Sequence, residues 1–280
     1  MVRPYRSVLY IPAANARAME KARDLPADAI IFDLEDAVAP EAKVDARQAL
    51  ADALAQDYGR CARIIRMNAL TTEWGRDDAR ACADLPADAV LVPKVDGPQD
   101  LDRVAELIPD VPLWAMMETP LGMLNAAAIA GDPRLQGMVM GTNDLAKELG
   151  SRPRPDRLPM MAGLGLCILA AKAHRKVIVD GVFNAFKDDD GLRAECEQGR
   201  DMGFDGKTLI HPAQLQIANN VFAPTEAEVN LARRQIDAFD QAQAEGRGVA
   251  VVDGRIVENL HVATARLTLD RAQAIAALAG

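Results

Sequence analysis

The sequence predicts an α/β fold: a closed (β/α)8 TIM barrel followed by a C-terminal helical extension that acts as a lid. Short apolar runs, which are typical of strands buried on both faces, alternate with helical segments about eight times over roughly 215 residues. Such alternation indicates parallel strands joined by crossover helices, and the number eight favours a closed barrel over an open sheet. Several polar residues also fall at the ends of the predicted strands, where the active sites of such barrels lie.

Each predicted strand is a short apolar run that ends in a proline, a charged residue or a turn. The first closes on Pro12, and the second ends in three acids, Asp33, Glu35 and Asp36. In chain order, the strands are expected at residues 6–12, 29–36, 63–68, 89–95, 113–118, 138–144, 177–182 and 206–212.

Capping and helix-breaking residues define the expected helices between these strands. Asn15 caps the first helix, Pro40 opens the second in its favoured first-turn position, and Gly97-Pro98 turns the chain into the fourth. The acids at 188–190 suit the positive end of a helix, so this charge run is interpreted as a cap rather than a ligand cluster. The helices are expected at residues 16–25, 40–57, 74–83, 99–108, 121–130, 160–175 and from 188 onward.

Residues 223–280 are expected to form a second part, outside a barrel of residues 1–222. The stretch from Thr225 to Glu228 resembles a capping box and predicts the start of a long helix. An extension of this kind often covers a site or packs on a neighbouring subunit, so we expect a lid over a site in the same subunit or in a neighbouring one. Its elements are expected to be a helix to about residue 244, an apolar run at 249–252, a turn at 253–254 and a last helix at 262–278.

The composition is that of a globular protein. Of the 280 residues, 50% are hydrophobic and 26% are charged, so the chain is long enough for a large core. The formal net charge of -9 argues against nucleic acid or an anionic membrane as the main partner. No apolar run of about 18 residues predicts a membrane span, and the start lacks a signal-peptide core. The four scattered cysteines have no disulfide or zinc spacing, so we expect a cytoplasmic protein with reduced cysteines.

Two acids at the ends of neighbouring strands form the candidate metal site. Glu118 follows the fifth apolar run and Asp144 follows the sixth. An acid at the end of a buried strand is costly unless it is paired, and two such acids on adjacent parallel strands can share a hard cation. We therefore predict a divalent ion here, and the small number of protein oxygens suggests Mg²⁺ with retained water. The alternative is two unrelated loop acids, one of which caps a helix.

Arg66 ends the third strand at the same mouth of the predicted barrel. Its planar fork matches a carboxylate, so it could clamp an oxoacid or a hydroxyacid. A structural pair with Glu35 or Asp36 is an equally good interpretation of this arginine. A divalent ion beside it would polarise a carbonyl or alkoxide oxygen. Together these groups suit the making or breaking of a carbon–carbon bond next to a carboxylate.

Lys94 and His211 suggest other chemistries, which the surrounding residues favour less. A Schiff-base lysine must lose its charge, whereas the acids around Lys94 would keep it charged, so a structural or electrostatic role is preferred. His211 has no evident partner in the sequence, and such a histidine is more often a satisfied strand-end residue than a base.

Six short motifs follow one another in order between residues 6 and 145. They are residues 6–12 (RSVLYIP), 32–38 (FDLEDAV), 66–68 (RMN), 92–95 (VPKV), 118–120 (ETP) and 141–145 (GTNDL). Together they resemble the citrate lyase beta-subunit-like family, which comprises CoA-ester lyases related to class II-type aldolases and malyl-CoA lyases.

This resemblance implies a (β/α)8 barrel that binds Mg²⁺ through the two acids named above. Arg66 would hold the carboxylate of the oxoacid, Gly141 and Thr142 would contact the substrate, and Asp36 would act from the outer metal shell. The implied reaction cleaves a 3-hydroxyacyl-CoA of the malyl-, citramalyl- or citryl-CoA type into an acyl-CoA and an oxoacid. Family members are commonly trimers or hexamers in which the C-terminal segment caps a neighbouring subunit's site.

One motif departs from the family pattern. Many of these lyases carry Gly-x-Met-Ile-Asp-x-Pro in the tail, and its Asp is the acid/base that exchanges a proton with the acyl-CoA carbon. The matching residues here, 254–260, read GRIVENL, so Glu258 replaces the Asp and the proline is absent. Glu can transfer the same proton with about one methylene more reach, although a surface acid at a helix start is the alternative. The changed tail leaves open a thioesterase on the same scaffold, and a third possibility is the beta subunit of a carrier-dependent citrate lyase complex.

Overall fold

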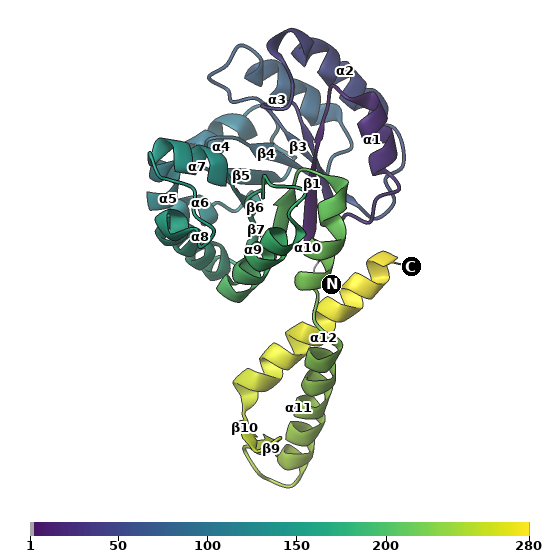
Figure 1. Cartoon of the computed structure of the whole chain (residues 1–280), viewed down its shortest axis with the longest axis vertical. Helices are drawn as coiled ribbons and strands as arrows, with labels where there is room; N and C mark the ends of the chain where they lie inside the picture. Colours follow the sequence, from purple (N-terminus) through teal and green to yellow (C-terminus); the bar gives the residue numbers. More distant parts are fainter. Residues whose placement is uncertain (1–2, 280) are drawn as a thin grey trace. The chain divides into compact units, whose positions relative to one another are not determined.

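The computed structural model describes residues 3–279 and contains a closed barrel of eight parallel strands with helices outside it (Figure 1). The predicted (β/α)8 fold with a helical extension is therefore confirmed. The chain divides into two compact units. Within the described residues, the barrel unit comprises residues 5–220, and the C-terminal unit comprises residues 221–279 together with residues 3 and 4.

Each strand pairs in parallel with the next one along the chain, and β8 closes the barrel on β1. The register pairs Val8 with Thr208 across this closure, and it pairs Asp33 with Arg66 at the ends of β2 and β3. The second of these pairings brings an acid and a base together at the mouth of the barrel. The strands are β1 Ser7–Pro12, β2 Ala29–Asp33, β3 Ala62–Arg66, β4 Ala89–Val92, β5 Leu113–Met117, β6 Leu135–Met140, β7 Val177–Asp180 and β8 Gly206–Leu209.

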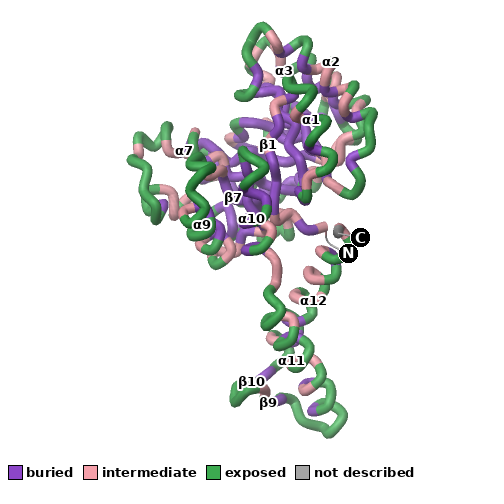
Figure 2. Tube along the Cα trace, turned by 45° about the vertical axis from the view of Figure 1, so that its right-hand side comes forward, coloured by how far each residue is buried: buried purple, intermediate pink, exposed green. Residues whose placement is uncertain are grey.

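Apolar side chains fill the interior of the barrel, whose strands are almost wholly buried (Figure 2). Trp114 of β5 is the largest fully buried side chain. It packs across Gly137 of β6, where an added Cβ would lie 2.6 Å from the indole ring. Tyr5 meets the same indole edge-on, with ring centroids 5.0 Å apart. Because the middle of the barrel is filled in this way, an open cavity has room only at the strand ends.

The helices of the barrel unit follow the predicted order but differ in detail. None of the helices within residues 3–279 is both long and apolar enough to cross a membrane. The α-helices are α1 Ala16–Ala22, α2 Lys43–Leu54, α3 Gly75–Asp84, α4 Pro98–Ala105, α5 Pro120–Leu124, α6 Ala126–Ala130, α7 Thr142–Glu148, α8 Met161–Ala173, α9 Asp189–Met202 and α10 Leu215–Val221. Short 3₁₀ turns are η1 Pro40–Ala42, η2 Leu158–Met160 and η3 Pro212–Gln214.

Two predicted elements were wrong in ways that affect the site. The sixth strand ends at Met140 rather than at Asp144, because the chain turns at Gly141 and Asp144 lies in the first turn of α7. The single helix expected at residues 121–130 is two short helices. Asn125 separates them, and its side chain donates a hydrogen bond to the backbone oxygen of Asp96 at 2.7 Å. Several other strands also end two or three residues earlier than expected, as is common for element boundaries.

Three of the four cysteines are core residues. Cys82, Cys167 and Cys196 are buried, and burial raises the pKa of each thiol to about 12. Thiols with such high pKa values are poor nucleophiles. This agrees with the prediction that these cysteines serve packing rather than chemistry.

The C-terminal unit consists of two long helices and a β-hairpin. Thr225 and Glu228 form a regular capping box at the start of α11 Glu226–Ala244. The hairpin pairs β9 Ala250–Val252 with β10 Arg255–Val257, and its turn residues Asp253 and Gly254 both have positive φ, as a tight Asp-Gly hairpin turn requires. The last helix, α12, spans Asn259–Ala279 and so begins three residues earlier than expected. A small core that includes Phe239, Val257 and Val262 holds these parts together.

Candidate active site

A cavity of about 300 Å³ opens at the C-terminal ends of the barrel strands. Residues from β1, β2, β3, β5 and β6 and from the loops after β6, β7 and β8 line it, so nearly the whole barrel contributes. The lining residues are Tyr10, Asp33, Asp36, Ala37, Arg66, Met116, Glu118, Met140, Gly141, Thr142, Asn143, Asp144, Val182, Asn184 and Ile210. The structure thus brings together the residues of the barrel unit that were predicted to bind the metal and the substrate, whereas Lys94 and His211 do not line this cavity.

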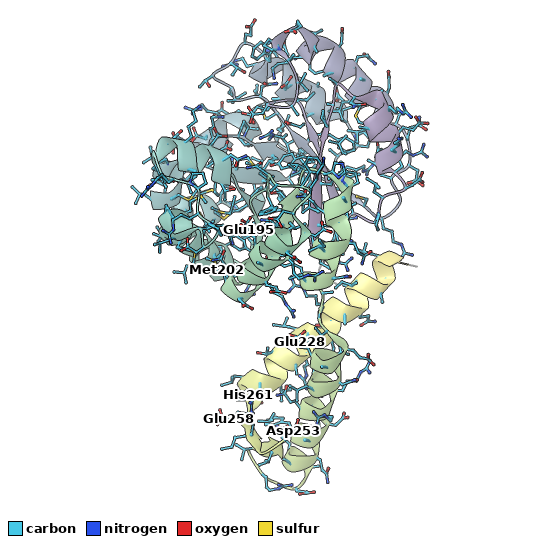
Figure 3. The ribbon with its side chains drawn as sticks, in the orientation of Figure 1. Glu195, Met202, Glu228, Asp253, Glu258 and His261 are labelled. Carbon is cyan, nitrogen blue, oxygen red and sulfur yellow. The ribbon has the colours of Figure 1, made fainter. Side chains whose placement is uncertain are left out.

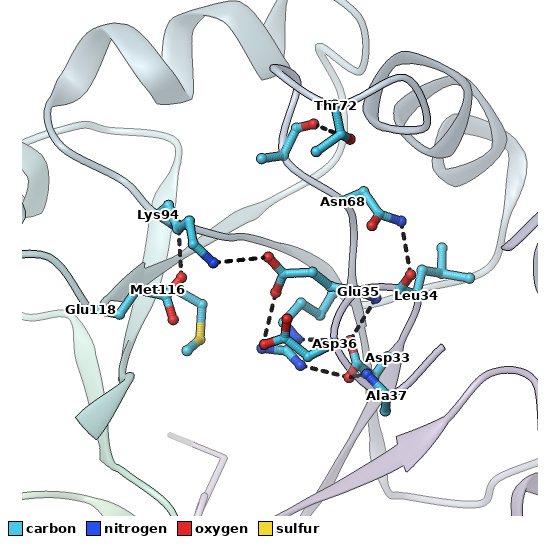
Figure 4. Close-up of polar contacts among 12 residues, drawn as sticks. Asp33, Leu34, Glu35, Asp36, Ala37, Asn68, Thr72, Lys94, Met116 and Glu118 are labelled. Carbon is cyan, nitrogen blue, oxygen red and sulfur yellow. Dashed lines mark hydrogen bonds and ion pairs between the residues drawn. The ribbon is translucent and has the colours of Figure 1, made fainter. Parts of the chain in front are cut away.

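Glu118 follows β5 and is almost fully buried, with 1% of its surface exposed. Its Oε1 accepts a hydrogen bond of 2.8 Å from the backbone N–H of Lys94 (Figure 4). Lys94 presents this N–H from a left-handed backbone conformation (φ 50°), which is uncommon for a residue other than glycine. Burial, reinforced by the nearby carboxylate of Glu35, raises the pKa of Glu118 to about 7. A buried carboxyl group of this kind favours a proton or a cation as its neighbour.

Gly141 leaves the space that the Glu118 carboxylate occupies. An added Cβ at Gly141 would lie 2.3 Å from Glu118 Cβ and 2.5 Å from its Oε2. The backbone N–H of Gly141 donates to the oxygen of Met117 at 2.9 Å, which joins the ends of β5 and β6. The glycine at this position is therefore explained by the close approach of the acid.

Asp144 lies on the same cavity wall as Glu118, in the first turn of α7, and is partly buried. The adjacent strands β5 and β6 pair Met117 with Met140, which puts both acids on neighbouring elements at the same mouth. Among the described residues, no group of three or more His, Cys, Asp or Glu side chains is arranged to hold a metal ion. Two carboxylates are a small ligand set, and such a set fits an ion that keeps several waters, as Mg²⁺ does.

The charge at this mouth is strongly negative. Five carboxylates stand against two cations, which gives a formal local charge of -3 when all are ionised. The carboxylates are Asp33, Glu35, Asp36, Glu118 and Asp144, and the cations are Arg66 and Lys94. Such an excess is unfavourable in a partly buried site, and a divalent cation would relieve it.

Arg66 is buried, and its principal partner was not among those expected from the sequence. Its Nε and Nη2 donate to the two oxygens of Asp33 over 2.7 and 2.6 Å. The expected partners are secondary: Glu35 Oε2 lies 3.0 Å from Nη1, and exposed Asp36 accepts a hydrogen bond of 3.5 Å from it. Burial opposes the charge of Arg66, but its surroundings, including Asp33, raise its pKa well above the usual value.

Tyr10 is a second site residue that sequence reasoning missed. The guanidinium carbon of Arg66 lies 4.9 Å from the centre of the Tyr10 ring, in a cation–π contact. The Tyr10 hydroxyl donates to Met116 Sδ at 3.4 Å, and burial raises its pKa above the ordinary value. The sequence could have indicated Tyr10 as a site residue by its position near the end of the first strand, which lies at the mouth of the barrel.

Lys94 and His211 behave as the sequence suggested. Lys94 Nζ lies 3.5 Å from Glu35 Oε1 (Figure 4), and although burial opposes its charge, Glu35 and Glu118 raise its pKa, so the lysine stays protonated. His211 accepts a hydrogen bond of 3.1 Å from the backbone N–H of Ala213 and stacks on Phe186 with ring centroids 4.8 Å apart. It is a satisfied residue after β8, as expected.

Thr142 and its neighbour Asn143 begin α7 on the same wall of the cavity. Thr142 is buried, and its Oγ1 would lie 2.4 Å from a Cβ added at Gly181, so the glycine permits close packing of the two loops. Asn143 and Asn184 exchange two side-chain hydrogen bonds of 2.8 and 3.3 Å across the loops after β6 and β7. These contacts fix the α7 end of the mouth.

Glu258 belongs to the C-terminal unit, at the junction between β10 and α12 (Figure 3). Its backbone N–H donates to His261 Nδ1 at 3.1 Å, and its backbone oxygen accepts from the N–H of His261 at 2.9 Å. Its carboxylate is exposed and makes no hydrogen bond or ion pair with any other residue in the range 3–279. The side chain is therefore available to another surface.

Comparison with known proteins gives a consistent picture. The family model described as HpcH/HpaI aldolase/citrate lyase matches residues 6–212. A protein of Cereibacter sphaeroides named (3S)-malyl-CoA thioesterase is 68% identical over 275 residues, which cover 98% of this chain and 96% of the relative. The citrate lyase subunit beta of Escherichia coli is 35% identical over 284 residues, covering 97% of this chain and 94% of the relative.

Solved structures resemble the chain as well. The protein CitE of Mycobacterium tuberculosis in complex with magnesium, acetoacetate and coenzyme A is 29% identical, with a TM-score of 0.82, and the match covers 97% of this chain and 100% of that one. The citrate lyase beta subunit of the same organism, complexed with oxaloacetate and magnesium, is 30% identical with a TM-score of 0.72, covering 79% of this chain and 98% of that one.

Proposed function

Because the chain belongs to the HpcH/HpaI aldolase/citrate lyase family, we propose that it is a Mg²⁺-dependent thioesterase for a 3-hydroxyacyl-CoA of the malyl-CoA type. The observation that carries this proposal is the 68% identity, over 98% of the chain, to a protein named (3S)-malyl-CoA thioesterase. The sequence identity to the citrate lyase subunit beta of Escherichia coli is much lower, at 35%. The tail of this chain also lacks the Asp and Pro of many lyases in this family, which agrees with an altered reaction.

Glu118 and Asp144 are assigned as the protein ligands of Mg²⁺. Three features support the assignment: the shared cavity, the pKa of about 7 at Glu118 and the excess of carboxylates around it. When bound, the ion supplies positive charge next to the oxygen on which negative charge develops during reaction. Solved relatives that are described as complexes with magnesium agree with this choice of ion.

Arg66, Gly141 and Thr142 are assigned to substrate binding. Arg66 would hold the carboxylate at the far end of the hydroxyacyl group, because it is the arginine that lines the cavity. Gly141 and Thr142 line the same cavity and would limit the space for the acyl chain. Asp36, exposed and weakly bonded to Arg66, is assigned to water that surrounds the ion.

Hydrolysis requires that a water oxygen attack the thioester carbon. The carbon–sulfur bond then breaks, the CoA sulfur leaves as a thiolate and takes up a proton, and the free hydroxyacid remains. We assign the transfer of the proton that the thiolate takes up to Glu258. The carboxylate of Glu258 is exposed and unpaired within the described part of the chain. Its position in the tail motif supports this role.

The C-terminal unit is proposed to act as a lid on a neighbouring subunit of a trimer or hexamer. Val251 and Ile256, which pair across the hairpin, are 64% and 59% exposed, and Leu260 is 62% exposed. An exposed apolar face next to Glu258 suits a surface that docks on another subunit. On the barrel, Leu124 of α5 and Leu169 of α8 are 76% and 71% exposed, which also favours self-association.

A carbon–carbon lyase is the second candidate, favoured by the similarity to citrate lyase beta subunits. The products separate the two reactions when (3S)-malyl-CoA is incubated with the protein and Mg²⁺. Thioester hydrolysis releases malate and a free CoA thiol, whereas the lyase reaction releases glyoxylate and acetyl-CoA. We expect thiol release without glyoxylate, and Glu118→Gln should abolish it. Glyoxylate as the main product would instead favour the lyase.

The third candidate, a subunit that works only with an acyl carrier, is tested in the same assay. If the protein forms no product from CoA thioesters but cleaves carrier-bound citrate, the result would favour the carrier-dependent subunit. The same result would count against both the thioesterase and the lyase, which use free CoA esters.

Mixing two inactive variants tests the proposed lid. Arg66→Ala removes the carboxylate-binding group, and Glu258→Gln removes the proton-transfer group. If each tail serves a neighbouring subunit, co-expressed variants should recover a measurable fraction of activity, because some sites combine an intact Arg66 with an intact Glu258. No recovery in mixed oligomers, verified by mass, would show that a tail does not complete another subunit's site.

A further inference from the structure

We propose that Asp33 and Tyr10 are positioning residues that present one edge of Arg66 to the substrate. They thereby select thioesters whose acyl group carries a free carboxylate. The inference rests on the proposed function, because it takes the substrate carboxylate as the ligand of Arg66. Asp33 and Tyr10 both line the cavity and both contact the guanidinium.

Asp33 holds Arg66 by one side of the guanidinium. Nε and Nη2 donate to its two oxygens over 2.7 and 2.6 Å. The same oxygens accept the backbone N–H groups of Glu35 at 2.8 Å and Ala37 at 3.0 Å. Asp33 is 1% exposed, so four donors fix its carboxylate in a buried setting, and the carboxylate in turn fixes the plane of the guanidinium.

Tyr10 supports the flat face of the same group. The ring centroid lies 4.9 Å from Arg66 Cζ, within the range of a cation–π contact. The hydroxyl contact with Met116 Sδ, at 3.4 Å, holds the ring from its far end. With one edge bonded to Asp33 and one face on Tyr10, the guanidinium cannot rotate without losing one of the two contacts.

The remaining donors of Arg66 belong to the edge formed by Nη1 and Nη2. Nη1 makes one long hydrogen bond of 3.5 Å, to exposed Asp36. Glu35 Oε2 lies 3.0 Å away as an ion pair, yet this oxygen accepts no hydrogen bond with proper geometry from any described residue. Of the five N–H groups of this guanidinium, which is 7% exposed, three make hydrogen bonds within the described residues, so donor capacity remains in the cavity wall for a ligand.

A substrate carboxylate would match this edge with two parallel hydrogen bonds, in place of the ion pair with Glu35 and the long hydrogen bond to Asp36. A thioester without that carboxylate leaves the buried donors unsatisfied, and sites built in this way reject such analogues strongly. The chemical class selected is therefore a CoA thioester whose acyl group ends in a carboxylate.

The test compares kcat/KM for (3S)-malyl-CoA and for 3-hydroxybutyryl-CoA, which has a methyl group in place of the carboxylate. The wild type is expected to prefer malyl-CoA by at least about 100-fold. Tyr10→Leu should raise KM for malyl-CoA by about 2- to 30-fold, the range of a cation–π contact, with little change in kcat. The preference should fall by the same factor. Tyr10→Phe keeps the ring but removes the hydroxyl contact with Met116, so its KM should lie between those of the wild type and Tyr10→Leu.

Asp33→Asn is expected to abolish most of the preference, because its amide places N–H donors opposite the donors of Arg66 and the backbone. Its fold is checked by circular dichroism. A wild-type preference in both Tyr10→Leu and Asp33→Asn would overturn the inference. An equal loss with both thioesters would overturn it too, because it would indicate a structural role only.

A second measurement is independent of turnover. In the ¹⁵N spectrum of arginine-labelled protein, the Nε–H of Arg66, assigned by its absence in Arg66→Lys, should be protected from exchange in the wild type and lose protection in Asp33→Asn. Unchanged protection overturns the positioning role even if the wild type acts on neither thioester. In that case the proposed function fails separately, on the turnover data alone.

Discussion

Replacing Glu118 by Gln probes the electrostatic cost of the candidate metal site. The carboxyl group is 1% exposed, and burial together with Glu35 raises its pKa from 4.5 to about 7. Gln keeps the shape of the side chain and its Oε1, which can still accept the hydrogen bond from the Lys94 N–H. The variant therefore removes the charge while leaving most of the packing in place.

The sign of the effect follows from proton linkage. A carboxyl group whose pKa is higher in the folded protein than in the unfolded chain binds more protons when folded, so its contribution to stability falls as pH rises between about 4.5 and about 7. At 1.36 kcal/mol per pKa unit, the full penalty above pH 7 is about 3 kcal/mol. Between about pH 5 and about pH 8 the wild type should lose about 2 to 3 kcal/mol more than the variant.

Urea denaturation in the presence of a chelator measures this difference. The free energy of unfolding is determined for both proteins at about pH 5 and about pH 8, so that any constant cost of the substitution cancels. Glu148→Gln, at an exposed acid on α7, controls for the change in net charge. Adding Mg²⁺ at about pH 8 should stabilise the wild type and leave Glu118→Gln unchanged. An identical pH dependence in Glu118→Gln and the wild type would refute the buried-charge reasoning.

Two other substitutions test the surroundings of the site. Gly141→Ala should lower Mg²⁺-dependent activity at least about 10-fold, because the new Cβ would lie 2.3 Å from Glu118 Cβ. Gly165→Ala, where an added Cβ meets nothing within 4 Å, should leave activity unchanged in the same steady-state assay. Asp180→Asn should destabilise the fold by about 3 to 5 kcal/mol in urea denaturation, because it removes a charged partner, at 3.3 Å, from fully buried Lys207. A loss below about 1 kcal/mol would contradict this.

The barrel was predictable because its signal is repeated. Alternating apolar runs and helices recur along the chain, and each repeat adds weight to the same architecture. The ends of the strands were less predictable. Asp144 was placed at the end of a strand, although Gly141, Thr142 and Asn143 before it are residues that often precede or begin helices. Asp144 lies at the mouth of the barrel whether it ends a strand or begins a helix. The error in local structure therefore did not change its predicted place in the site.

Glu35 and Asp36 were expected as partners of Arg66 and do form ion pairs with it, but its principal partner, Asp33, could not be read from the sequence in the same way. Asp33 lies 33 positions before Arg66, and only the register of β2 against β3 makes them neighbours. Asp33, Glu35 and Asp36 are all acids at the end of one strand, and sequence alone does not say which of them points at the arginine. Lys207 lies within a predicted buried strand, and this position was not used in the sequence analysis. A lysine there requires buried partners of opposite charge, such as Asp180.

The charges at the mouth also set the order in which ligands bind. A substrate carboxylate that enters before any cation would add to a formal charge of -3, and the five acids would oppose its approach to Arg66. With a divalent ion on Glu118 and Asp144, the formal charge falls to -1, so the edge of Arg66 formed by Nη1 and Nη2 attracts an anion against less opposing charge. We therefore expect Mg²⁺ to bind before the carboxylate. The affinity for malate, measured by calorimetry, should be far weaker with a chelator than with the ion. Equal affinities would show that Arg66 attracts the anion without help from the metal site.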